Sequence, residues 1–338
     1  MRPVKSESLF FYLLYAIILL MKKVIFISSL ILVLTIIFTG CGKVEEDIYT
    51  SIYHYIVFTS QRDGHNEIYA MYYKGTSQVR LTNTSSNVSN EMASWSPSVN
   101  AIVFVSDRDG NREIYTMNSN GTSPNRITND SSDDINPSWS QDGTKIVFAS
   151  NRNNTTENYD IYTMNPDGSS IQRLTVTPVE ENYPDWSPNS TQIVYTSKIG
   201  VSNNREVYIM NSDGTSQTRL TTSSSDKKST NWSPSGNYIS YAGQDSNSIY
   251  QLFKINTDGS NDTRLTNFTT NCDGGGWCYL GILCSFSSEI EATGNTDIYY
   301  IKNDGSILSR LTTADGIDYD PDWSLAITVT SNCPICLQ

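Results

Sequence analysis

A repeated unit, present six times, constrains the fold of this chain more than any other feature. Each unit carries one tryptophan, and successive tryptophans lie 44 to 47 residues apart. In each unit an aromatic residue is followed six residues later by a glycine and eleven residues later by an arginine that opens Arg-Leu-Thr or Arg-Ile-Thr. The tryptophans are Trp95, Trp139, Trp186, Trp232, Trp277 and Trp323, and the arginines are Arg80, Arg126, Arg173, Arg219, Arg264 and Arg310. Units of this kind predict an architecture in which neighbouring repeats bury their apolar faces against each other.

One unit has the pattern of four short β-strands. Residues 137–140 contain the tryptophan, and residues 145–150 are rich in the β-branched and aromatic side chains of a second strand. Residues 160–165 and 171–175 follow, joined by a turn in which Gly168 supplies the positive φ angle of a short hairpin connection. Four strands without helical periodicity in about 45 residues predict one blade of a β-propeller. The predicted fold class is therefore all-β, a six-bladed β-propeller with four-stranded blades.

The two ends of the repeat region indicate how the ring closes. The first unit begins directly at a second strand, residues 55–59, and the last Trp-Ser pair, at Trp323, has no unit after it. The simplest closure pairs residues 322–324 with residues 55–59, which removes an open sheet edge. The propeller is therefore expected to span residues 51–325, with residues 326–338 as a C-terminal tail.

The repeated tryptophans and arginines have the character of structural residues. A tryptophan buries roughly 150–250 Å², and sheets arranged in a ring need large side chains where they meet. We therefore expect the tryptophans between neighbouring blades, and the arginines in an ion pair or a hydrogen bond at the outer strand. Acidic residues of a suitable kind recur at the same place in five units: Glu67, Glu113, Asp160, Glu206 and Asp297.

The N-terminal region has the pattern of a secretion signal. Lys22 and Lys23 precede an apolar run at residues 24–38, and Thr39 and Gly40 supply the small residues that a signal peptidase needs. The segment resembles a bacterial lipobox. This resemblance implies that Cys41 is the lipid-modified first residue of the mature protein.

The lipobox divides the N-terminal region into expected parts. Residues 1–40 are expected to be the signal peptide, and residues 41–50 a short tether. Residues 1–20 look like an upstream extension, in which case translation begins at Met21. The alternative is an uncleaved membrane helix, although an apolar run of about 17 residues is at the short end of what spans a bilayer. Both alternatives place the propeller outside the cytoplasm, attached to a bacterial membrane at its periplasmic face or at the cell surface.

The repeat also carries the motifs of a known family. Residues 102–110 read Ile-Val-Phe-Val-Ser-Asp-Arg-Asp-Gly, residues 113–115 read Glu-Ile-Tyr, and Arg-Leu-Thr and Pro-x-Trp-Ser-Pro complete the pattern in other units. This pattern resembles the WD40-like (PD40) repeat of the TolB-like propellers over about residues 55–324. The resemblance implies a propeller of the bacterial cell envelope. The N-terminal α/β domain of TolB and the hydrolase domain of propeller peptidases are not expected here, so neither a Tol–Pal role nor peptidase activity is expected.

Net charge and the inventory of reactive side chains argue against two classes of function. The chain has 35 acidic and 23 basic residues, a formal net charge of −12, whereas nucleic-acid binding needs clustered lysine and arginine. It contains no Gly-x-Ser-x-Gly motif, and its two histidines, His54 and His65, lack the spacing of a metal site. We therefore expect a protein that is not an enzyme, without a cofactor, a metal ion or a nucleic-acid partner.

Acidic residues gather in the connections between blades, which all emerge on one face of a propeller. They outnumber the two bases of these connections, Lys227 and Lys228. The residues expected to form an acidic rim on this face are Glu91, Asp133, Asp134, Glu180, Glu181, Asp318 and Asp320. Such a rim is either solvated surface charge or a site that attracts a cation or a basic partner. Calcium bound within residues 317–322 is a further alternative, because hard cations prefer oxygen ligands.

The fifth tryptophan lies in the most divergent unit. Three glycines precede Trp277, and a cysteine replaces the serine that follows the other tryptophans. Besides Cys41, the cysteines are Cys272, Cys278, Cys284, Cys333 and Cys336. Outside the cytoplasm a disulfide is a commoner outcome than a zinc site, so we expect Cys272 to pair with Cys278 and Cys284 to be a buried thiol. If one sector of the ring is adapted to a task, this unit is the best candidate.

These features together predict a lipid-anchored, monomeric protein-binding or scaffold module of the bacterial cell envelope. Its expected partners are envelope proteins, recognised by loops on the acidic face that a rigid ring holds in place. The alternative is a sensor that binds a small ligand or a carbohydrate in the channel of the propeller.

Overall fold

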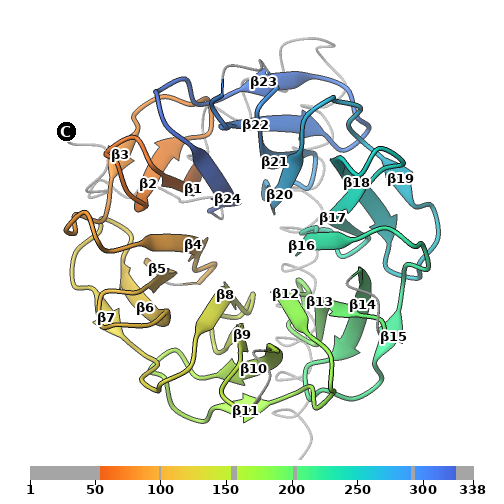
Figure 1. The fold of residues 1–338 in the computed structure, drawn as a ribbon, viewed down its shortest axis with the longest axis horizontal. Coiled ribbons are helices and arrows are strands. Elements are labelled where there is room, and N and C mark those ends of the chain that lie inside the picture. The colour runs from red at the N-terminus through yellow and green to blue at the C-terminus, as the bar shows by residue number, and fades with distance from the viewer. Residues whose placement is uncertain (1–53, 99, 154–157, 201–203, 291–293, 325–338) are drawn as a thin grey trace, which may run out of the picture. The chain divides into compact units, whose positions relative to one another are not determined.

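Six antiparallel sheets of four strands form a ring in the computed structural model, which describes residues 54–98, 100–153, 158–200, 204–290 and 294–324 (Figure 1). Each sheet is one blade, and its four strands succeed one another from the central channel outward. All the regular elements of the described residues are strands. The structure thus confirms the predicted all-β, six-bladed propeller with four-stranded blades.

The strands occupy four positions in the blades. The innermost strands are β4 (Asn90–Trp95), β8 (Asp134–Trp139), β12 (Glu181–Trp186), β16 (Lys227–Trp232), β20 (Cys272–Trp277) and β24 (Asp318–Trp323). The second strands are β1 (Tyr55–Ser60), β5 (Ala101–Ser106), β9 (Ile146–Ser150), β13 (Gln192–Lys198), β17 (Tyr238–Gln244) and β21 (Leu283–Ser288). The third strands are β2 (Glu67–Tyr72), β6 (Glu113–Asn118), β10 (Asp160–Met164), β14 (Arg205–Asn211), β18 (Tyr250–Asn256) and β22 (Asp297–Lys302). The outer strands are β3 (Val79–Arg80), β7 (Asn125–Arg126), β11 (Gln172–Arg173), β15 (Thr218–Arg219), β19 (Thr263–Arg264) and β23 (Leu308–Arg310).

The C-terminal strand closes the ring, as predicted. β24 pairs with β1, so blade 1 consists of β24, β1, β2 and β3, and blades 2 to 6 follow in chain order. Ile56 is the partner of Trp323 in this pairing, and Val57 is the partner of Asp322. The innermost strand of blade 1 therefore comes from the opposite end of the repeat region.

The inner strand β8 begins earlier than the sequence predicted. β8 begins at Asp134, three residues before the expected start at Pro137. A β-bulge shifts its register with β9 between Ile135 and Ser138, and Asn136 there has a φ of 50°. The inner strand is an edge strand that faces the channel, so the missing N–H of Pro137 breaks no ladder. The proline and the bulge together conceal the first half of this strand in the sequence.

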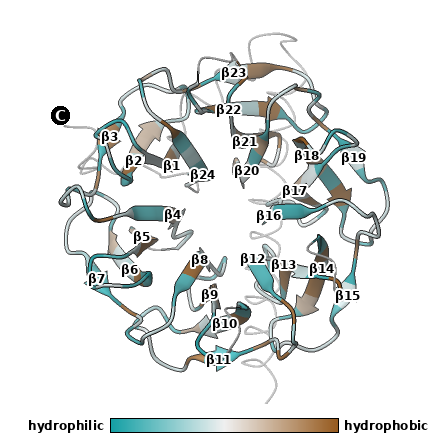
Figure 2. Cartoon of the chain, in the orientation of Figure 1, coloured by the Kyte–Doolittle hydropathy of each residue, from teal (hydrophilic) through white to brown (hydrophobic). Residues whose placement is uncertain are grey.

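The tryptophans form the contacts between blades, as predicted. All six are buried, with 5–7% of their surface exposed. Trp95 of blade 2 packs against Leu81 and Tyr55 of blade 1, and its ring stacks on that of Tyr55 with centroids 6.2 Å apart. Figure 2 shows polar residues along the inner strands β4, β12 and β16, and apolar residues along third strands such as β14 and β18. The core therefore lies between the blades, and the inner strands are left to line the channel.

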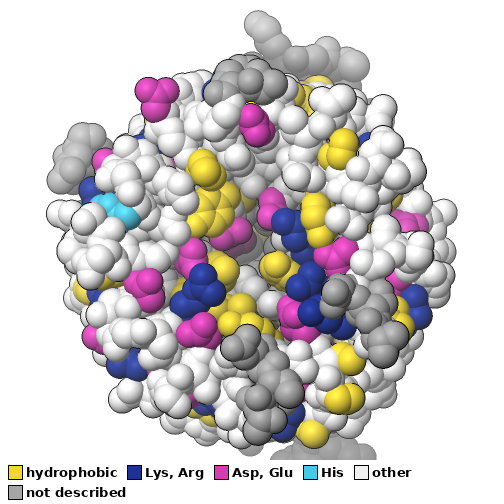
Figure 3. All heavy atoms as spheres, viewed as in Figure 1, with side chains coloured by type: hydrophobic (Ala, Val, Ile, Leu, Met, Phe, Trp, Pro, Cys, Tyr) yellow, Lys and Arg dark blue, Asp and Glu magenta, His cyan; other side chains and the backbone are white. Residues whose placement is uncertain are grey.

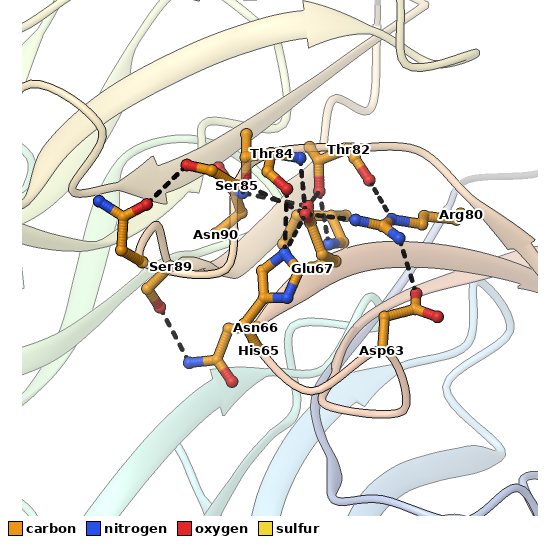
Figure 4. A network of polar contacts seen from close by, with 12 residues as sticks. Asp63, His65, Asn66, Glu67, Arg80, Thr82, Thr84, Ser85, Ser89 and Asn90 are labelled. Atoms are coloured by element: carbon orange, nitrogen blue, oxygen red, sulfur yellow. Dashed lines mark hydrogen bonds and ion pairs between the residues drawn. The ribbon is translucent and has the colours of Figure 1, made fainter.

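The repeated arginine pairs with the repeated acid in five of the six blades. Arg80 Nη2 lies 2.6 Å from Glu67 Oε1, and the buried Glu67 carboxylate also accepts hydrogen bonds from Thr82, from Thr84 N and from Asn90 (Figure 4). The equivalent pairs are Arg126–Glu113 at 2.6 Å, Arg173–Asp160 at 2.8 Å, Arg219–Glu206 at 3.2 Å and Arg310–Asp297 at 2.6 Å. Blade 5 has a glutamine, Gln251, at the acidic position, and Arg264 pairs with Asp245 there instead, at 3.1 Å.

Several predictions concern residues outside the described ranges. They are the signal peptide, the lipid site Cys41, the tether and the C-terminal tail with Cys333 and Cys336. In the part of the chain that the structure describes, we find no helix with the length and apolar character needed to cross a membrane.

Candidate functional site

The predicted acidic face carries basic residues as well. Because the strands of each blade are antiparallel, the connections between blades and those between second and third strands leave the ring on the same face. Figure 3 shows basic, acidic and apolar side chains interspersed around the central opening. Both sets of connections therefore determine the charge on this face.

The structure divides the predicted acidic rim into buried and accessible carboxylates. Asp134, Glu181 and Asp318 are the first residues of β8, β12 and β24, and at most 1% of each is exposed. Glu91, the second residue of β4, is buried too. Asp133, Glu180 and Asp320 are partly exposed. The first four therefore contribute little accessible negative charge, which corrects the expectation of a continuous acidic rim.

Arginines of the loops after the second strands hold two of the buried carboxylates. Arg62 Nη2 lies 2.9 Å from Asp318 Oδ2, and Arg152 Nη2 lies 2.6 Å from Asp134 Oδ2. The guanidinium carbon of Arg62 lies 4.6 Å from the centre of the Tyr69 ring, so aromatic contact adds to the ion pair. A count limited to the connections between blades misses these arginines. Their sequence signal is an arginine two residues after the serine that ends β1, β5 or β9.

The partly exposed acids Glu180 and Asp133 also have partners. Lys198 Nζ lies 2.7 Å from Glu180 Oε2, and Arg205 Nη2 lies 2.8 Å from Glu180 Oε1. Burial opposes ionisation of Glu180, but the hydrogen bonds from Lys198 and Arg205 outweigh it and lower its pKa overall. Asp133 Oδ1 accepts a hydrogen bond from the backbone N–H of Arg112 at 3.0 Å. Glu180 is thus neutralised on the rim, and Asp133 is held by the backbone.

The central channel contains a cavity of about 200 Å³. One set of residues that line it holds the third position of every inner strand: Met92, Asn136, Tyr183, Ser229, Gly274 and Asp320. All of these except Gly274 have φ values of 50–56°, in the left-handed region that side chains other than glycine rarely adopt. Each lies at or next to the bulge in its strand. The bulge therefore recurs at this level of the channel whatever the identity of the side chain.

Asp320 is the acceptor without a donor at this level. None of the described residues donates a hydrogen bond to its carboxylate, whereas the nearby Glu91 receives one from Tyr319 Oη at 3.2 Å. Burial raises the pKa of Asp320 to about 8, with Asp273 and Glu91 adding to the effect and Lys228 opposing it. The channel thus presents a carboxyl group that a cationic or hydrogen-bonding group from outside could satisfy.

Two further carboxylates line the channel and connect neighbouring blades. Asp185 Oδ2 accepts a hydrogen bond from Trp232 N at 2.7 Å, and Asp322 Oδ2 accepts one from Trp95 N at 2.8 Å. Burial raises the pKa of Asp185 to about 6 and that of Asp322 to about 7. Because both bind the backbone of the next blade, their role is structural.

The divergent sector contains free thiols. Cys272, Cys278 and Cys284 are all buried and unbonded, so the predicted Cys272–Cys278 disulfide is wrong. β20 begins at Cys272, and Cys278 follows directly after its last residue, Trp277. Six steps of extended chain cover about 20 Å, far beyond the roughly 7 Å that a disulfide spans between Cα atoms. The prediction that Cys284 is a buried thiol is confirmed.

The three glycines of this sector serve close packing. A Cβ atom on Gly275 would lie 2.6 Å from Pro321 Cγ and 2.8 Å from the Pro321 carbonyl oxygen. A Cβ atom on Gly276 would lie 2.6 Å from Asp322 Oδ1. The backbone of β20 therefore approaches β24 more closely than any larger residue permits, which gives this divergence a structural reason.

The described residues offer little for metal binding by side chains alone. They include no group of three or more histidine, cysteine, aspartate or glutamate side chains placed to hold a metal ion. In the stretch considered for calcium, Asp318 pairs with Arg62, Asp322 binds Trp95 N, and Asp320 faces the channel. These carboxylates do not converge. His65 Nε2 lies 2.8 Å from Glu67 Oε1 in the outer network, and His54 is buried beside Trp323.

Solved structures of several proteins resemble this ring. TolB from Acinetobacter baumannii matches with a TM-score of 0.70 at 18% identity, over 84% of this chain and 71% of that chain. A candidate TolB from Agrobacterium tumefaciens matches with a TM-score of 0.59 at 17% identity, over 81% of this chain and 99% of that chain. Oligogalacturonate lyase from Vibrio parahaemolyticus matches with a TM-score of 0.54 at 12% identity, over 77% of this chain and 74% of that chain. At these identities the likeness shows the fold alone.

Comparison at the level of sequence identifies the family. A search of curated protein sequences gave no match. The PD40 profile, which describes the TolB β-propeller domain, matches residues 53–203 and 84–281. These overlapping matches cover more than half of the chain and nearly all of blades 1 to 5. The chain therefore belongs to the TolB β-propeller (PD40) family.

Proposed function

We propose that this protein is a lipid-anchored propeller outside the cytoplasm of a bacterium, and that it binds a protein of the cell envelope at the channel mouth. Membership of the TolB β-propeller family supports a place in the envelope. The lipobox pattern before Cys41 supports anchoring by lipid. The proposed role is that of a binding or scaffold module, because a rigid ring can present loops from six blades to one partner.

The observation that carries this proposal is the Asp320 carboxyl group at the channel. It has no hydrogen-bond donor among the described residues, and it lines a cavity together with Tyr183 and Met92. A lysine, arginine or amide side chain of a partner would supply the missing donor, while Tyr183 and Met92 would supply apolar contact. Asp133 at the rim would help to orient a basic segment as it approaches.

Site-specific crosslinking in living cells tests this proposal. A photoreactive phenylalanine placed at Met92 lies at the channel, whereas the same residue placed at Ile171 lies exposed on a hairpin turn and serves as the matched control. We expect Met92 to crosslink to one discrete envelope protein, Ile171 to give no such product, and Asp320→Asn to weaken the product. Equal products from both positions, or none from Met92, would contradict the proposal.

The lipid anchor is tested separately. Cys41→Ser should abolish incorporation of labelled palmitate and release the protein from the membrane fraction. Retention of both properties by the variant would refute the anchor but not the binding site.

A second candidate function is the binding of a small ligand in the channel, favoured by the cavity itself. Its volume of about 200 Å³ is below the roughly 300–1,000 Å³ of typical small-molecule sites, and this favours a side chain of a partner over a whole ligand. Thermal-shift measurements with sugars and amines distinguish the two, because a ligand that binds the native state raises the melting temperature.

The proposed role is not enzymatic. The likeness to oligogalacturonate lyase is limited to the fold. Of the two histidines, His54 is buried in the packing and His65 belongs to the Glu67 network. Cleavage of oligogalacturonate by the purified protein would overturn this part of the proposal.

A further inference from the structure

Exposed apolar side chains gather on blade 6. Among the described residues, seven large apolar side chains are exposed, and four of them belong to this blade: Tyr279, Leu280, Ile307 and Leu308, each 40–56% exposed. Tyr279 and Leu280 lie in the turn between β20 and β21, and Ile307 and Leu308 lie where the turn between β22 and β23 ends. We call these four residues the apolar patch.

The two turns of the apolar patch lie side by side. Asn303, in the second turn, donates from its backbone N–H to the Ile282 carbonyl oxygen at 3.0 Å and from its side chain to the Gly281 carbonyl oxygen at 3.1 Å. Because the strands are antiparallel, the turns between first and second strands and between third and outer strands leave the ring opposite the connections that carry Asp133 and Glu180. The patch therefore lies on the face opposite the predicted acidic rim, which we call the turn face.

Polar residues stand at these places in other blades. Ile307 has a φ of 51°, in the left-handed region that β-branched side chains rarely adopt. The equivalent residues, all with a positive φ, are Ser77, Ser123, Ser170, Ser216 and Asn261. The residues that replace Leu280 in blades 2 to 5 are Ser98, Asp142, Asn189 and Ser235. The fold thus does not need apolar side chains here, and apolar surface exposed without a structural reason marks a site of interaction.

The chain enters the propeller beside the patch. His54, the first described residue, precedes β1 at the turn face of blade 1, where its carbonyl oxygen accepts a hydrogen bond from Tyr73 N at 3.0 Å. Blade 1 is the neighbour of blade 6 in the ring (Figure 1). Cys41 precedes His54 by 13 residues, a span of at most about 45 Å. A lipid on Cys41 therefore holds the turn face of blades 1 and 6 close to a bilayer and raises the effective concentration of lipid there.

Charge also favours this side of the turn face. In the described turns of blades 2 to 4, three acids outnumber one lysine; these residues are Asp142, Asp167, Asp213 and Lys145. Around blades 5, 6 and 1, three acids are balanced by three lysines; these residues are Asp258, Asp262, Asp304, Lys74, Lys254 and Lys302. Lys254 belongs to β18, but its ammonium group donates to the Asn303 carbonyl oxygen in a turn of the patch. A bilayer with anionic lipids therefore repels the far side of the ring but not the side with the patch.

We propose that the apolar patch of blade 6 inserts into the surface of the lipid bilayer and forms a second membrane contact beside the lipid on Cys41. This inference rests on the lipid anchor of the proposed function. Leu280, Ile307 and Leu308 enter the boundary between headgroups and acyl chains, and the Tyr279 ring lies at the same level, because aromatic rings with a polar end favour this interface. The opposite face, with the channel mouth, then points away from the bilayer, where an envelope protein can reach it.

Fluorescence quenching in vesicles tests the contact. The full chain is purified in detergent and reconstituted in vesicles of phosphatidylethanolamine and phosphatidylglycerol that include a lipid with a nitroxide on its acyl chain. A fluorophore is attached to Leu308→Cys or to Ile171→Cys, with Cys333 and Cys336 changed to serine. Ile171 is the matched control, because it holds the place of Leu308 in blade 3, with the same exposure of 40%, on the far side of the ring (Figure 1).

We expect the nitroxide lipid to remove most of the fluorescence at Leu308→Cys and little of it at Ile171→Cys. Leu280→Ser combined with Ile307→Ser gives blade 6 the residues found at these places in other blades, so the fold should be kept. In this background the quenching at Leu308→Cys should fall to the level of the control, while the protein still floats with the vesicles.

The outcomes separate the patch from the anchor. A protein that floats with the vesicles but is quenched equally at both positions would overturn the contact and leave the anchor intact. A protein that does not float would overturn the anchor and the contact with it. If Leu308→Cys is quenched only in a chain that ends at Ser324, residues 325–338 cover the patch in the full chain, and the proposal is overturned. Energy transfer between labelled copies without quenching by lipid would place a second copy on the patch and would overturn it as well.

Discussion

Ser324 and Tyr55, 269 positions apart in the sequence, exchange two hydrogen bonds. Tyr55 N donates to Ser324 Oγ at 2.9 Å, and Ser324 N donates to the Tyr55 carbonyl oxygen at 2.8 Å. These bonds continue the pairing of β24 with β1, so the last blade contact of the ring forms between the two ends of the propeller. Closure is thus a property of the whole chain, and no single repeat contains it.

Truncation of the C-terminal strand should therefore show how much ring closure contributes to stability beyond the repeats themselves. A chain that ends after Gly316 lacks β24, whereas a chain that ends after Ser324 retains it. We expect the shorter chain to lose its cooperative thermal transition, because β1 becomes an open edge and Trp323 no longer fills the junction. Circular dichroism during heating measures this. If both chains melt as the full chain does, closure contributes no stability.

The repeated arginines should contribute different amounts to the free energy of unfolding, depending on their partners. Arg80→Ala leaves the buried Glu67 carboxylate without its positive partner, and we expect a loss of about 3 kcal/mol in the free energy of unfolding. Arg264→Ala is the matched control, because Arg264 pairs with Asp245 and the neutral Gln251 takes the place of the buried acid in its blade, so a loss of about 1 kcal/mol or less is expected. Urea titration compares the two. Equal losses would show that the buried acid does not depend on the arginine.

Buried carboxyl groups in the channel should make stability fall as pH rises. Burial raises the pKa of Asp322 to about 7 in the folded protein, whereas an aspartate in the unfolded chain titrates near about 3.9. The folded state therefore binds the proton more tightly, so the contribution of Asp322 is complete below about pH 4 and is lost as pH rises through about 7.

Asp322→Asn should remove this fall, which is on the order of 4 kcal/mol between those limits, while its amide oxygen can still accept the Trp95 N–H. Asp213→Asn in an exposed hairpin turn is the control: hydrogen bonds from Thr215 lower the pKa of Asp213, so it titrates below this range and its replacement should leave the profile between about pH 4 and 7 unchanged. An Asp322→Asn profile identical to that of the wild type would contradict the expectation.

The three thiols of the described sector should be unreactive until the protein unfolds. Burial raises the pKa of Cys272 to about 11 and that of Cys284 to about 12, so little thiolate forms. In a variant with Cys41, Cys333 and Cys336 changed to serine, a thiol reagent should label none of the remaining cysteines in the native protein and all of them after denaturation without reductant. Failure to label Cys272 and Cys278 in the denatured chain would show that these two cysteines form a disulfide.

The close approach of β20 to β24 should make Gly275 intolerant of substitution. Gly275→Ala places a Cβ atom 2.6 Å from Pro321 Cγ, and we expect a loss of about 1–3 kcal/mol from overpacking. The double variant with Pro321→Ala should recover part of this loss, which a double-mutant cycle measures. Independent, additive effects of the two changes would show that the glycine serves another purpose.

The periodic features of the sequence predicted the ring well. Tryptophans such as Trp95 and Trp323 recur at fixed spacing because each blade buries a large side chain at the same junction. Pairs such as Arg80 and Glu67 recur because the outer strands of five blades are held in the same way. Features that repeat in every unit are imposed by contacts that repeat in every unit, and such contacts can be inferred from spacing. Ring closure could be predicted as well, because the first unit lacks an inner strand and the last tryptophan segment has no unit after it.

The candidate site was harder to predict, because it depends on contacts between parts of the chain that spacing does not relate. Asp134 was expected to be surface charge, but β8 begins earlier than its proline suggests, and Arg152 from another loop neutralises the carboxylate. The Cys272–Cys278 pairing was inferred from proximity in sequence. The two cysteines are far apart in space because an extended strand lies between them. The importance of Asp320 lies in the absence of a donor around it, which only coordinates reveal.

The left-handed residue found in five of the six inner strands has a consequence for how such rings diversify. The backbone kink is kept whether the position holds methionine, asparagine, tyrosine, serine or aspartate, so the fold tolerates chemically unrelated choices at this place. Mutation can therefore change the side chain that a single blade presents to the channel, while the inner-strand backbone and the tryptophan contacts between blades stay as they are. A gene duplicated in this family could acquire a new binding preference without first having to solve a new folding problem.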